Sequence, residues 1–357
     1  MCSVFSVYGR RIVMFKKLVV CVLSLAFAAA AMAQNNKLNV FIWSEYIDPK
    51  IVEQFEKQFD CKVTIDLYED NESMMAKLQG GGASLYDICV PSDYIIPALL
   101  KEKLLAPLRP ENIPNLKNLD PQFANREYDP GNKYTAPYQW GTSGIYVRKG
   151  KDEAVEETWG LIFDPNKQLG PFLMLDDART TIGVALLYKG FDVNSTDKAQ
   201  LRQARDLILD AKKRSRGFEG AVGGKNKVLA KICKMAMVYN GDAARGMKDD
   251  AETSYFVPRE GSEIWLDNLA IPAQAPHREM AEKFINYVLD ARIGAQLSNF
   301  NRYATPNKAA REFINPDDLK NAAIYPPPEV MQKLHFVKDL GAKSQWYDEL
   351  WTQIKSK

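Results

Sequence analysis

Residues 38–103 decide the fold, and they read LNVFIWSEYIDPKIVEQFEKQFDCKVTIDLYEDNESMMAKLQGGGASLYDICVPSDYIIPALLKEK. Three short apolar runs in this stretch have the length and composition of strands. They span Leu38 to Trp43, Lys62 to Leu67, and Asp87 to Val90. We therefore expect three strands within about fifty residues.

Helical patterns follow these strands. Asp48 can cap a first helix that has Pro49 at its first position, Asn71 can cap a second, and Tyr94 to Lys103 forms a third. Alternating strands and helices are typical of a doubly wound parallel sheet. The alternation resumes after Tyr146, with strands at about 172–175, 234–239 and 269–273 and helices at about 181–190, 198–214 and 279–289. The sequence predicts an α/β protein.

Aromatic and acidic residues lie at the ends of five apolar runs. They occur in Trp43-Ser44-Glu45-Tyr46, Pro91-Ser92-Asp93-Tyr94, Asp176-Asp177, Asn240-Gly241-Asp242 and Trp265-Leu266-Asp267. Ligands of open α/β sheets bind outside the carboxyl ends of the strands. Carboxylates and ring faces, with no Lys or Arg among them, suit a positively charged ligand on an apolar skeleton. We therefore expect an organic polycation.

Each of these residues also has a structural interpretation. Trp43 could belong to the core, and one acid of the Asp176-Asp177 pair could cap the following helix while the other lines the cleft. Tyr138 and Trp140 are expected to pack at a hinge in preference to contacting the ligand.

The amino terminus indicates export. Met14-Phe15-Lys16-Lys17 precedes an apolar run from Leu18 to Ala31, and Ala31-Met32-Ala33 is a small-x-small cleavage site. This is the pattern of a secretory signal peptide in residues 1–33, with 1–13 as a possible upstream extension. A retained membrane anchor is disfavoured because the run is shorter than the roughly 20 residues that span a bilayer.

Charge and cysteine content exclude several classes of protein. The 47 basic side chains, less the four in residues 1–33, leave 43 against 45 acidic ones, a net charge of −2. Such a chain has no electrostatic footprint for nucleic acid or an anionic membrane. Cys61, Cys89 and Cys233 have no paired spacing, and we expect the first two to be small buried residues. Neither a metal nor a cofactor is expected.

Five motifs occur in order along the predicted mature chain. They are Trp43-Ser44-Glu45-Tyr46, Tyr86-Asp87 with Val90-Pro91-Ser92, Asp176-Asp177-Ala178-Arg179, Trp265-Leu266-Asp267 with Leu269-Ala270-Ile271-Pro272, and Tyr303-Ala304-Thr305-Pro306-Asn307. Together they resemble the periplasmic polyamine-binding proteins of bacterial ABC importers for spermidine and putrescine.

The resemblance implies a type II periplasmic-binding-protein fold, in which a ligand cleft separates two α/β lobes with mostly parallel sheets. It places residues 34–140 and 267–311 in the first lobe and 141–266 and 312–357 in the second. It also implies a monomer in the periplasm, with the signal peptide cleaved after Ala33, that delivers its ligand to an inner-membrane ABC permease and its ATPase.

The resemblance also implies a set of ligand-binding residues. Those that match the family are Trp43, Ser44, Glu45, Tyr46, Ser92, Tyr94, Asp177, Trp265, Asp267 and Tyr303. Two further positions, Tyr239 and Asp242, differ from the spermidine-binding members, which have Trp at the first and a small neutral residue at the second.

The departures from the family bear on selectivity. Spermidine-binding members have Glu at the position of Thr180 and Gln near Val337, so one amine-holding carboxylate is missing here. Asp242 stands where putrescine-binding members have Asp. These differences favour putrescine without excluding spermidine.

Two other function classes fit parts of the pattern. A secreted glycosidase could use two of these carboxylates as acid and base. A binding protein for another solute, such as an iron complex, thiamine or an amino acid, is the second. An amino-acid binder needs an Arg against the ligand carboxylate, and Arg179, the one candidate in these clusters, is expected to point away from the cleft.

Overall fold

The computed structural model describes residues 36–150 and 153–357. The predicted signal peptide, residues 1–33, lies outside the described residues. Within the described part of the chain, no helix is both long enough and apolar enough to cross a membrane.

The amino-terminal part of the chain forms three parallel strands, as the sequence predicts. Their order is β2 (Lys62–Tyr68), β1 (Lys37–Trp43) and β3 (Ile88–Cys89), with β1 in the middle. The short third strand brings its following loop, residues 91–95, next to the end of β1. Residues after Trp43 and after Cys89 therefore meet at one edge of the sheet.

Helices flank these strands, and their starts follow from capping side chains. α2 (Pro49–Phe59) begins after Asp48, whose carboxylate accepts a hydrogen bond from the Lys50 amide at 2.9 Å, as predicted. α3 (Asn71–Gln79) is capped by Asp70, which accepts from the Ser73 amide at 2.7 Å. The prediction that Asn71 caps this helix is wrong by one residue, because the Asp70 carboxylate reaches the free amide first. α4 (Ile96–Lys101) follows a 3₁₀ turn.

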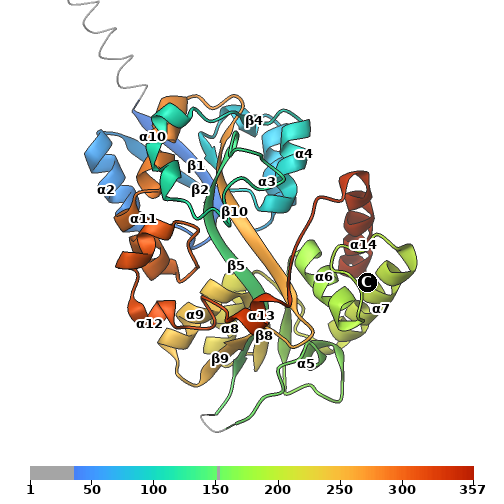
Figure 1. Cartoon of the computed structure of the whole chain (residues 1–357). Helices are drawn as coiled ribbons and strands as arrows, with labels where there is room; N and C mark the ends of the chain where they lie inside the picture. The colour runs from blue at the N-terminus through green and yellow to red at the C-terminus, as the bar shows by residue number, and fades with distance from the viewer. Residues whose placement is uncertain (1–35, 151–152) are drawn as a thin grey trace, which may run out of the picture.

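Two long antiparallel strands run through the middle of the molecule. β5 (Thr135–Arg148) pairs with β10 (Ser262–Pro272), and the register shifts between Asp267 and Asn268. Figure 1 shows both strands passing from one half of the molecule into the other. The predicted strand at 269–273 is the end of β10. The other long strand, β5, was not predicted.

Each long strand pairs with different neighbours at its two ends. The carboxyl-terminal end of β10 pairs with β3 and β4 (Leu105–Ala106), and its amino-terminal end pairs with β11 (Leu334–Phe336). The carboxyl-terminal half of β5 pairs with β8 (Met235–Tyr239) and β9 (Thr253–Phe256). The α/β prediction is confirmed. The sheet is mixed because β5 runs antiparallel to its partners, whereas β10 runs antiparallel to β3, β4 and β5 but parallel to β11.

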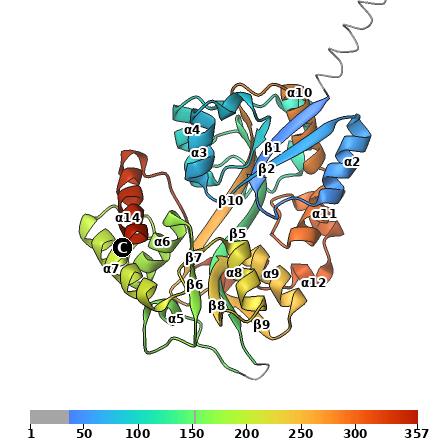
Figure 2. The ribbon, with the colours of Figure 1, turned by 180° about the vertical axis from the view of Figure 1, so that it is seen from behind.

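The other half of the molecule continues this sheet in the order β8, β6 (Phe172–Leu175), β7 (Phe218–Glu219), with parallel pairing. Figure 2 shows helices on both sides of these strands. On one side lie α6 (Ala178–Tyr188), α7 (Lys198–Arg214) and α14 (Ser344–Ser356), and on the other α8 (Ala221–Leu229) and α9 (Asn240–Asp249). The other α-helices of the described residues are α5 (Gly160–Phe163), α10 (Arg278–Val288), α11 (Ala291–Asn301), α12 (Pro316–Leu319) and α13 (Pro328–Met331).

Separate buried clusters fill the two halves. Phe55 and Phe284 belong to the cluster around β1 and α10, whereas Phe172 and Tyr347 belong to the cluster around β6 and α14. A smaller cluster that contains Trp140 lies where β5 and β10 cross between them. Each half thus has its own hydrophobic core, and the long strands β5 and β10 connect the two halves.

The three cysteines in the described residues are free. Cys89 and Cys233 are buried, and Cys61 is half-buried. The expectation of a small buried residue is confirmed for Cys89 and is wrong for Cys61, which lies just before β2 and is partly exposed. Burial also raises the pKa of the Cys89 thiol to about 12, which keeps the sulfur protonated and unreactive.

Candidate ligand-binding cleft

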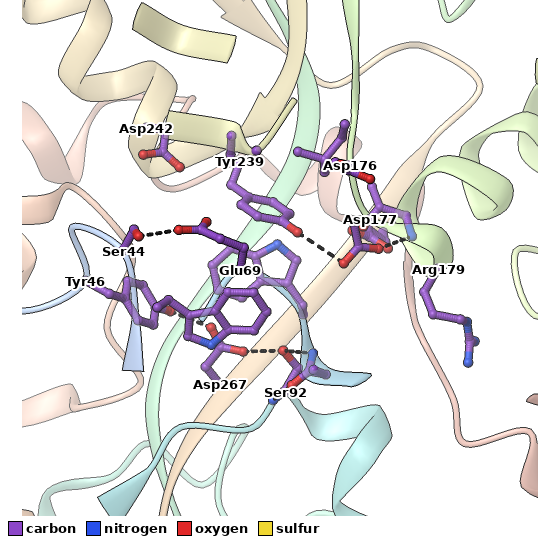
Figure 3. A pocket seen from close by; sticks show the side chains of 18 of the residues that line it. Ser44, Tyr46, Glu69, Ser92, Asp176, Asp177, Arg179, Tyr239, Asp242 and Asp267 are labelled. Atoms are coloured by element: carbon purple, nitrogen blue, oxygen red, sulfur yellow. Dashed lines mark hydrogen bonds between the residues drawn. The ribbon is translucent and has the colours of Figure 1, made fainter. Parts of the chain in front are cut away.

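A cavity lies between the two halves of the molecule, beside the middle of β5 and β10 (Figure 3). Its wall contains side chains that follow β1, β3, β6 and β8, together with side chains on β10 itself. Of the residues that the sequence singled out, the wall includes Trp43, Ser44, Tyr46, Ser92, Tyr94, Asp177, Tyr239, Asp242, Trp265, Asp267 and Tyr303. The carboxyl ends of strands from both halves thus meet at one site.

Asp267 forms a buried acidic subsite on β10. Its carboxylate accepts hydrogen bonds from the Tyr46 hydroxyl at 2.7 Å and from the Ser92 hydroxyl at 2.6 Å. Burial raises the pKa of Asp267 to about 7, and the two hydroxyls only partly offset this cost. Both of these partners are neutral, so the site holds a carboxylate without a counter-charge.

Asp177 combines the two roles that the sequence left open for the Asp176-Asp177 pair. Its carboxylate caps α6 by accepting from the Thr180 amide at 2.7 Å, and it also lines the cavity. The Tyr239 hydroxyl lies 3.5 Å from its other oxygen (Figure 3). Burial raises the pKa of Asp177. Asp176 pairs with Lys355 at 2.8 Å and is half exposed at the rim.

Glu263 is a cleft carboxylate that the sequence analysis missed. It is 3% exposed, lines the same cavity, and accepts hydrogen bonds at Oε1 from the Ser143 and Thr180 hydroxyls, each at 2.6 Å. Burial, and then the charge of Asp177, raise the pKa of Glu263 to about 7.

The signal for Glu263 is present in the sequence. Alternate residues of a strand face the same side, so Glu263, Trp265 and Asp267 share one face of β10. The acids expected in the cleft are those that follow apolar runs, whereas Glu263 lies near the start of β10.

Aromatic rings form the apolar part of the wall. Trp265 packs edge-on against Tyr239 and Tyr303, with ring centroids 5.6 and 5.4 Å apart. Trp43 is fixed by a hydrogen bond from its indole nitrogen to the Val90 carbonyl at 2.9 Å. Rings that are held in this way present rigid apolar faces to a ligand.

Asp242 is already engaged by other residues. Its carboxylate accepts from the Tyr303 hydroxyl at 2.7 Å, and its other oxygen pairs with Arg245, three residues further along α9. The expectation that the cluster contains no Lys or Arg is therefore wrong. Because one helical turn separates Asp242 from Arg245, their side chains lie on the same face of the helix. Asp242 lines the cavity as a neutralised acid.

Glu45 is the predicted site residue that does not line the cavity. Its backbone is left-handed, with φ of 52°, and its exposed side chain pairs with Arg245 at 2.8 Å and Lys225 at 3.1 Å. Both partners belong to the other half of the molecule, on α9 and α8. In this structure Glu45 connects the two halves at the edge of the cleft.

Arg179 is among the residues that line the cavity, but its side chain points away from the acids (Figure 3). Its guanidinium lies over the rings of Tyr94 and Tyr347, at 5.1 and 4.8 Å, and donates to the Lys338 carbonyl at 3.1 Å. The positive charge of Arg179 is thus engaged by these two rings and this carbonyl, behind the cavity wall.

Tyr138 and Trp140 do not line the cavity. The Tyr138 hydroxyl donates to the Tyr46 carbonyl at 2.7 Å, and Trp140 stacks on Phe123 with ring centroids 5.3 Å apart. Both lie on β5 where the strand passes between the halves, which agrees with hinge packing.

The charges around the cavity add up to an unbalanced acidic site. Asp177, Glu263 and Asp267 are buried and have no cationic side chain within ion-pair distance among the described residues. The other acids of the cleft walls are paired with Lys or Arg or are exposed. Within the described ranges no group of His, Cys, Asp and Glu is placed to hold a metal ion.

Comparison with known proteins extends over almost the whole chain. Residues 50–327 match the family described as bacterial extracellular solute-binding protein. The spermidine/putrescine-binding periplasmic protein of Escherichia coli is 32% identical over 94% of this chain and 96% of that protein. A putrescine/cadaverine-binding protein of Pseudomonas aeruginosa is 33% identical over 96% of this chain and 99% of that protein.

Solved structures give the same picture. A putative spermidine/putrescine ABC transporter from Listeria monocytogenes superposes with a TM-score of 0.84 at 34% identity, over 90% of this chain and 99% of that one. A spermidine/putrescine substrate-binding protein of Streptococcus pneumoniae gives 0.74 at 30% identity, over 90% and 99%. The predicted fold class, a type II periplasmic-binding-protein fold, is confirmed by this likeness.

Proposed function

Because the chain belongs to the family of bacterial extracellular solute-binding proteins, we propose that it captures a polyamine, putrescine or spermidine or both, for an ABC transporter. The proposal rests on the acidic cleft and on relatives whose names include spermidine, putrescine or cadaverine. The family works outside the cytoplasm, as the names of its periplasmic members indicate.

One observation carries the proposal: Asp177, Glu263 and Asp267 line one cavity, and the hydrogen bonds that they receive from described residues come from neutral groups. Burying a carboxylate without a counter-charge is costly. An alkylammonium group that enters the cavity removes this cost, and a charge-assisted hydrogen bond contributes about 1.5–3 kcal/mol. A ligand with two or three ammonium groups on one chain is the solute that such a site favours.

The aromatic side chains of the wall can contact the apolar part of a polyamine. Polyamines carry methylene segments between their charges, and the faces of Trp43, Trp265 and Tyr239 can cover these segments. A cation over such a ring is attracted by about 0.5–2 kcal/mol. A metal ion or an amino acid would make no use of this combination of acids and rings.

We further propose that the two halves are lobes that close over the ligand, with 34–140 and 267–311 in one and 141–266 and 312–357 in the other. The crossing of β5 and β10 near Trp140 and Asp267 supports these boundaries. Contacts across the cleft support closure, since the Tyr303 hydroxyl donates to Asp242 and Glu45 pairs with Arg245.

The partners and the location follow from this function. We propose that signal peptidase cleaves after Ala33, that the mature protein is a monomer in the periplasm, and that its closed form docks on an inner-membrane permease driven by an ATPase. The proposal includes no nucleic acid, cofactor or metal. A carboxylate-dependent hydrolase is disfavoured, because the relatives reported above are solute-binding proteins and transporter components.

The test is calorimetry of the mature protein, residues 34–357, with putrescine, cadaverine, spermidine and spermine, and with arginine and thiamine as comparison cations. We expect saturable one-to-one binding of at least one polyamine, much tighter than the comparison cations. Absence of heat and of thermal stabilisation with all four polyamines would contradict the proposal.

A further inference from the structure

Glu263 is buried and has no salt-bridge partner among the described residues. Its carboxylate is buried against the cavity, and both of its hydrogen bonds within the described residues arrive at Oε1, from Ser143 and Thr180. The charge of Arg179 lowers the pKa of Glu263, but its guanidinium is engaged with two aromatic rings and a carbonyl.

The two hydroxyl groups hold Glu263 in a fixed position. Ser143 lies on β5 and Thr180 in the first turn of α6, so two different elements orient one carboxylate oxygen. Hydroxyl donors favour the ionised form of a carboxyl group. This arrangement resembles that of Asp267, which also receives two hydroxyl hydrogen bonds and also lines the cavity.

The chain itself sets the separation between these two acids. Glu263 and Asp267 are four residues apart on the same face of β10, and a strand rises about 3.3 Å per residue, so their Cα atoms are roughly 13 Å apart. Asp267 is held by Tyr46 and Ser92, and Glu263 is held by Ser143 and Thr180, so the two carboxylates share none of these partners. The strand therefore sets the spacing between the two acids.

Polyamines differ in whether their terminal ammonium groups can span this spacing. An extended chain advances roughly 1.2–1.3 Å per bond, given C–C lengths near 1.5 Å, so the terminal nitrogens of putrescine are about 6 Å apart and those of spermidine about 11 Å. A charge-assisted hydrogen bond adds about 2.8 Å at each end, so extended putrescine bridges two carboxylates about 12 Å apart and extended spermidine two that are about 17 Å apart. Acids spaced about 13 Å apart along the strand are therefore just beyond an extended diamine and within reach of a triamine that bends.

We propose that Glu263 is a ligand-binding carboxylate that holds the far ammonium group of a triamine, so that the cleft selects spermidine-like ligands over diamines. Thr180 and Ser143 are positioning residues that act through Glu263. This inference rests on the proposed function, and it adds which class of polyamine the cleft prefers. It replaces the expected preference for putrescine, because Asp242 is neutralised by Arg245 and Glu263 supplies a carboxylate beside Thr180.

The deciding experiment compares Glu263→Gln with wild type and with Glu53→Gln. Glu53 is an exposed acid on α2, outside the cavity wall, and gives the same change in charge. Affinities for spermidine and putrescine are measured by calorimetry at pH 8. We expect Glu263→Gln to weaken spermidine at least tenfold, to change putrescine less than threefold, and Glu53→Gln to change neither.

The outcomes separate this inference from the proposed function. If wild type binds no polyamine, both are wrong. If wild type binds spermidine and Glu263→Gln binds it equally well, only the role of Glu263 is wrong. An equal loss of affinity for spermidine and putrescine would overturn the proposed selectivity, since Glu263 would then contact both ligands.

A second variant covers the case in which Glu263→Gln does not fold. Thr180→Val removes one positioning hydroxyl but keeps the carboxylate, so the protonated form of Glu263 becomes more favourable. We expect the pH at which spermidine binding is half lost to move upward, with putrescine unaffected. An unchanged pH profile for spermidine in this variant would overturn the inference.

Discussion

Asp267 shows how a single buried carboxylate can make the cleft prefer a cationic ligand. It was expected from the sequence as the acid after Trp265, and the structure places it against Tyr46 and Ser92. Residues far apart in the chain supply these partners, so sequence spacing could predict the acid but not its hydrogen bonds. The buried, uncompensated carboxylate costs stability that a bound cation returns.

The first prediction follows from this cost. Asp267→Asn should weaken polyamine binding by about 1.5–3 kcal/mol, the contribution of a charge-assisted hydrogen bond. The unliganded variant should be as stable as wild type at pH 8 or more stable, because a buried charge is removed. Calorimetry and thermal unfolding check the two parts. Unchanged affinity in a folded variant would exclude Asp267 from the site.

The second prediction concerns pH. The pKa values of Asp267 and Glu263 are raised to about 7, so between about pH 4 and 7 the folded state holds protons that the unfolded chain has released. These two groups therefore stabilise the unliganded protein below pH 4, and this contribution is lost as the pH rises through 7.

Ligand binding should show the opposite dependence. A polyamine needs ionised carboxylates, and its own ammonium groups, like that of lysine with a pKa near 10.4, stay charged. Affinity should fall by roughly tenfold per pH unit below 7 for each carboxylate that the ligand contacts. Dissociation constants measured at pH 8, 7 and 6 test this dependence. A constant affinity over that range would show that neither acid meets the ligand.

At the level of elements, the strands and helices with regular patterns were predictable. α2 begins at Pro49 after Asp48, and α7 spans Lys198–Arg214, both as the sequence indicates. β5 was missed because Pro137, Gly141 and Gly144 interrupt its apolar run. The register of β5 against β10 shifts between Pro137 and Gln139, and an irregularity of this kind tolerates a residue without an amide donor.

Gly141 has a packing reason of its own, which gives the third prediction. A Cβ atom at this position would lie within 3 Å of Asn240 Oδ1 and of the Trp265 ring. Gly141→Ala should therefore displace the ring that lines the cleft and destabilise the protein by about 1–3 kcal/mol, the usual cost of overpacking.

Chemical unfolding of Gly141→Ala measures this cost, with Gly150→Ala as the control. At Gly150 an added Cβ atom meets its nearest neighbour at 3.9 Å, an ordinary contact. Polyamine affinity should fall in Gly141→Ala alone. Equal stabilities for the two variants would contradict the close packing of Trp265 against β5.

At the level of the whole molecule, the acidic cleft depends on two bodies coming together. The sequence predicted acids on both sides, but it could not show which of them pair with cations across or beside the gap. Arg245 neutralises Asp242 and also binds Glu45 from the other half, and this depends on the distance between α9 and the loop after β1. Among the described acids that line the cavity, Asp177, Glu263 and Asp267 are the buried ones without a paired cation, whereas Glu69 is exposed.

The fourth prediction is that ligand binding closes the molecule by hinge motion at β5 and β10. Small-angle scattering of the mature protein should give a smaller radius of gyration with saturating spermidine than without it. Asp267→Asn at the same ligand concentration should show a smaller decrease. An identical radius of gyration for wild type in both states would exclude closure.

A crystal structure of the mature protein with spermidine tests the central claim most directly. The account predicts the ligand along β10, with one nitrogen 2.7–2.9 Å from a carboxylate oxygen of Asp267 and the far nitrogen equally close to Glu263. The methylene groups should lie against the ring of Trp265. Spermidine bound elsewhere, or bound in the cleft without contact to either acid, would contradict the account.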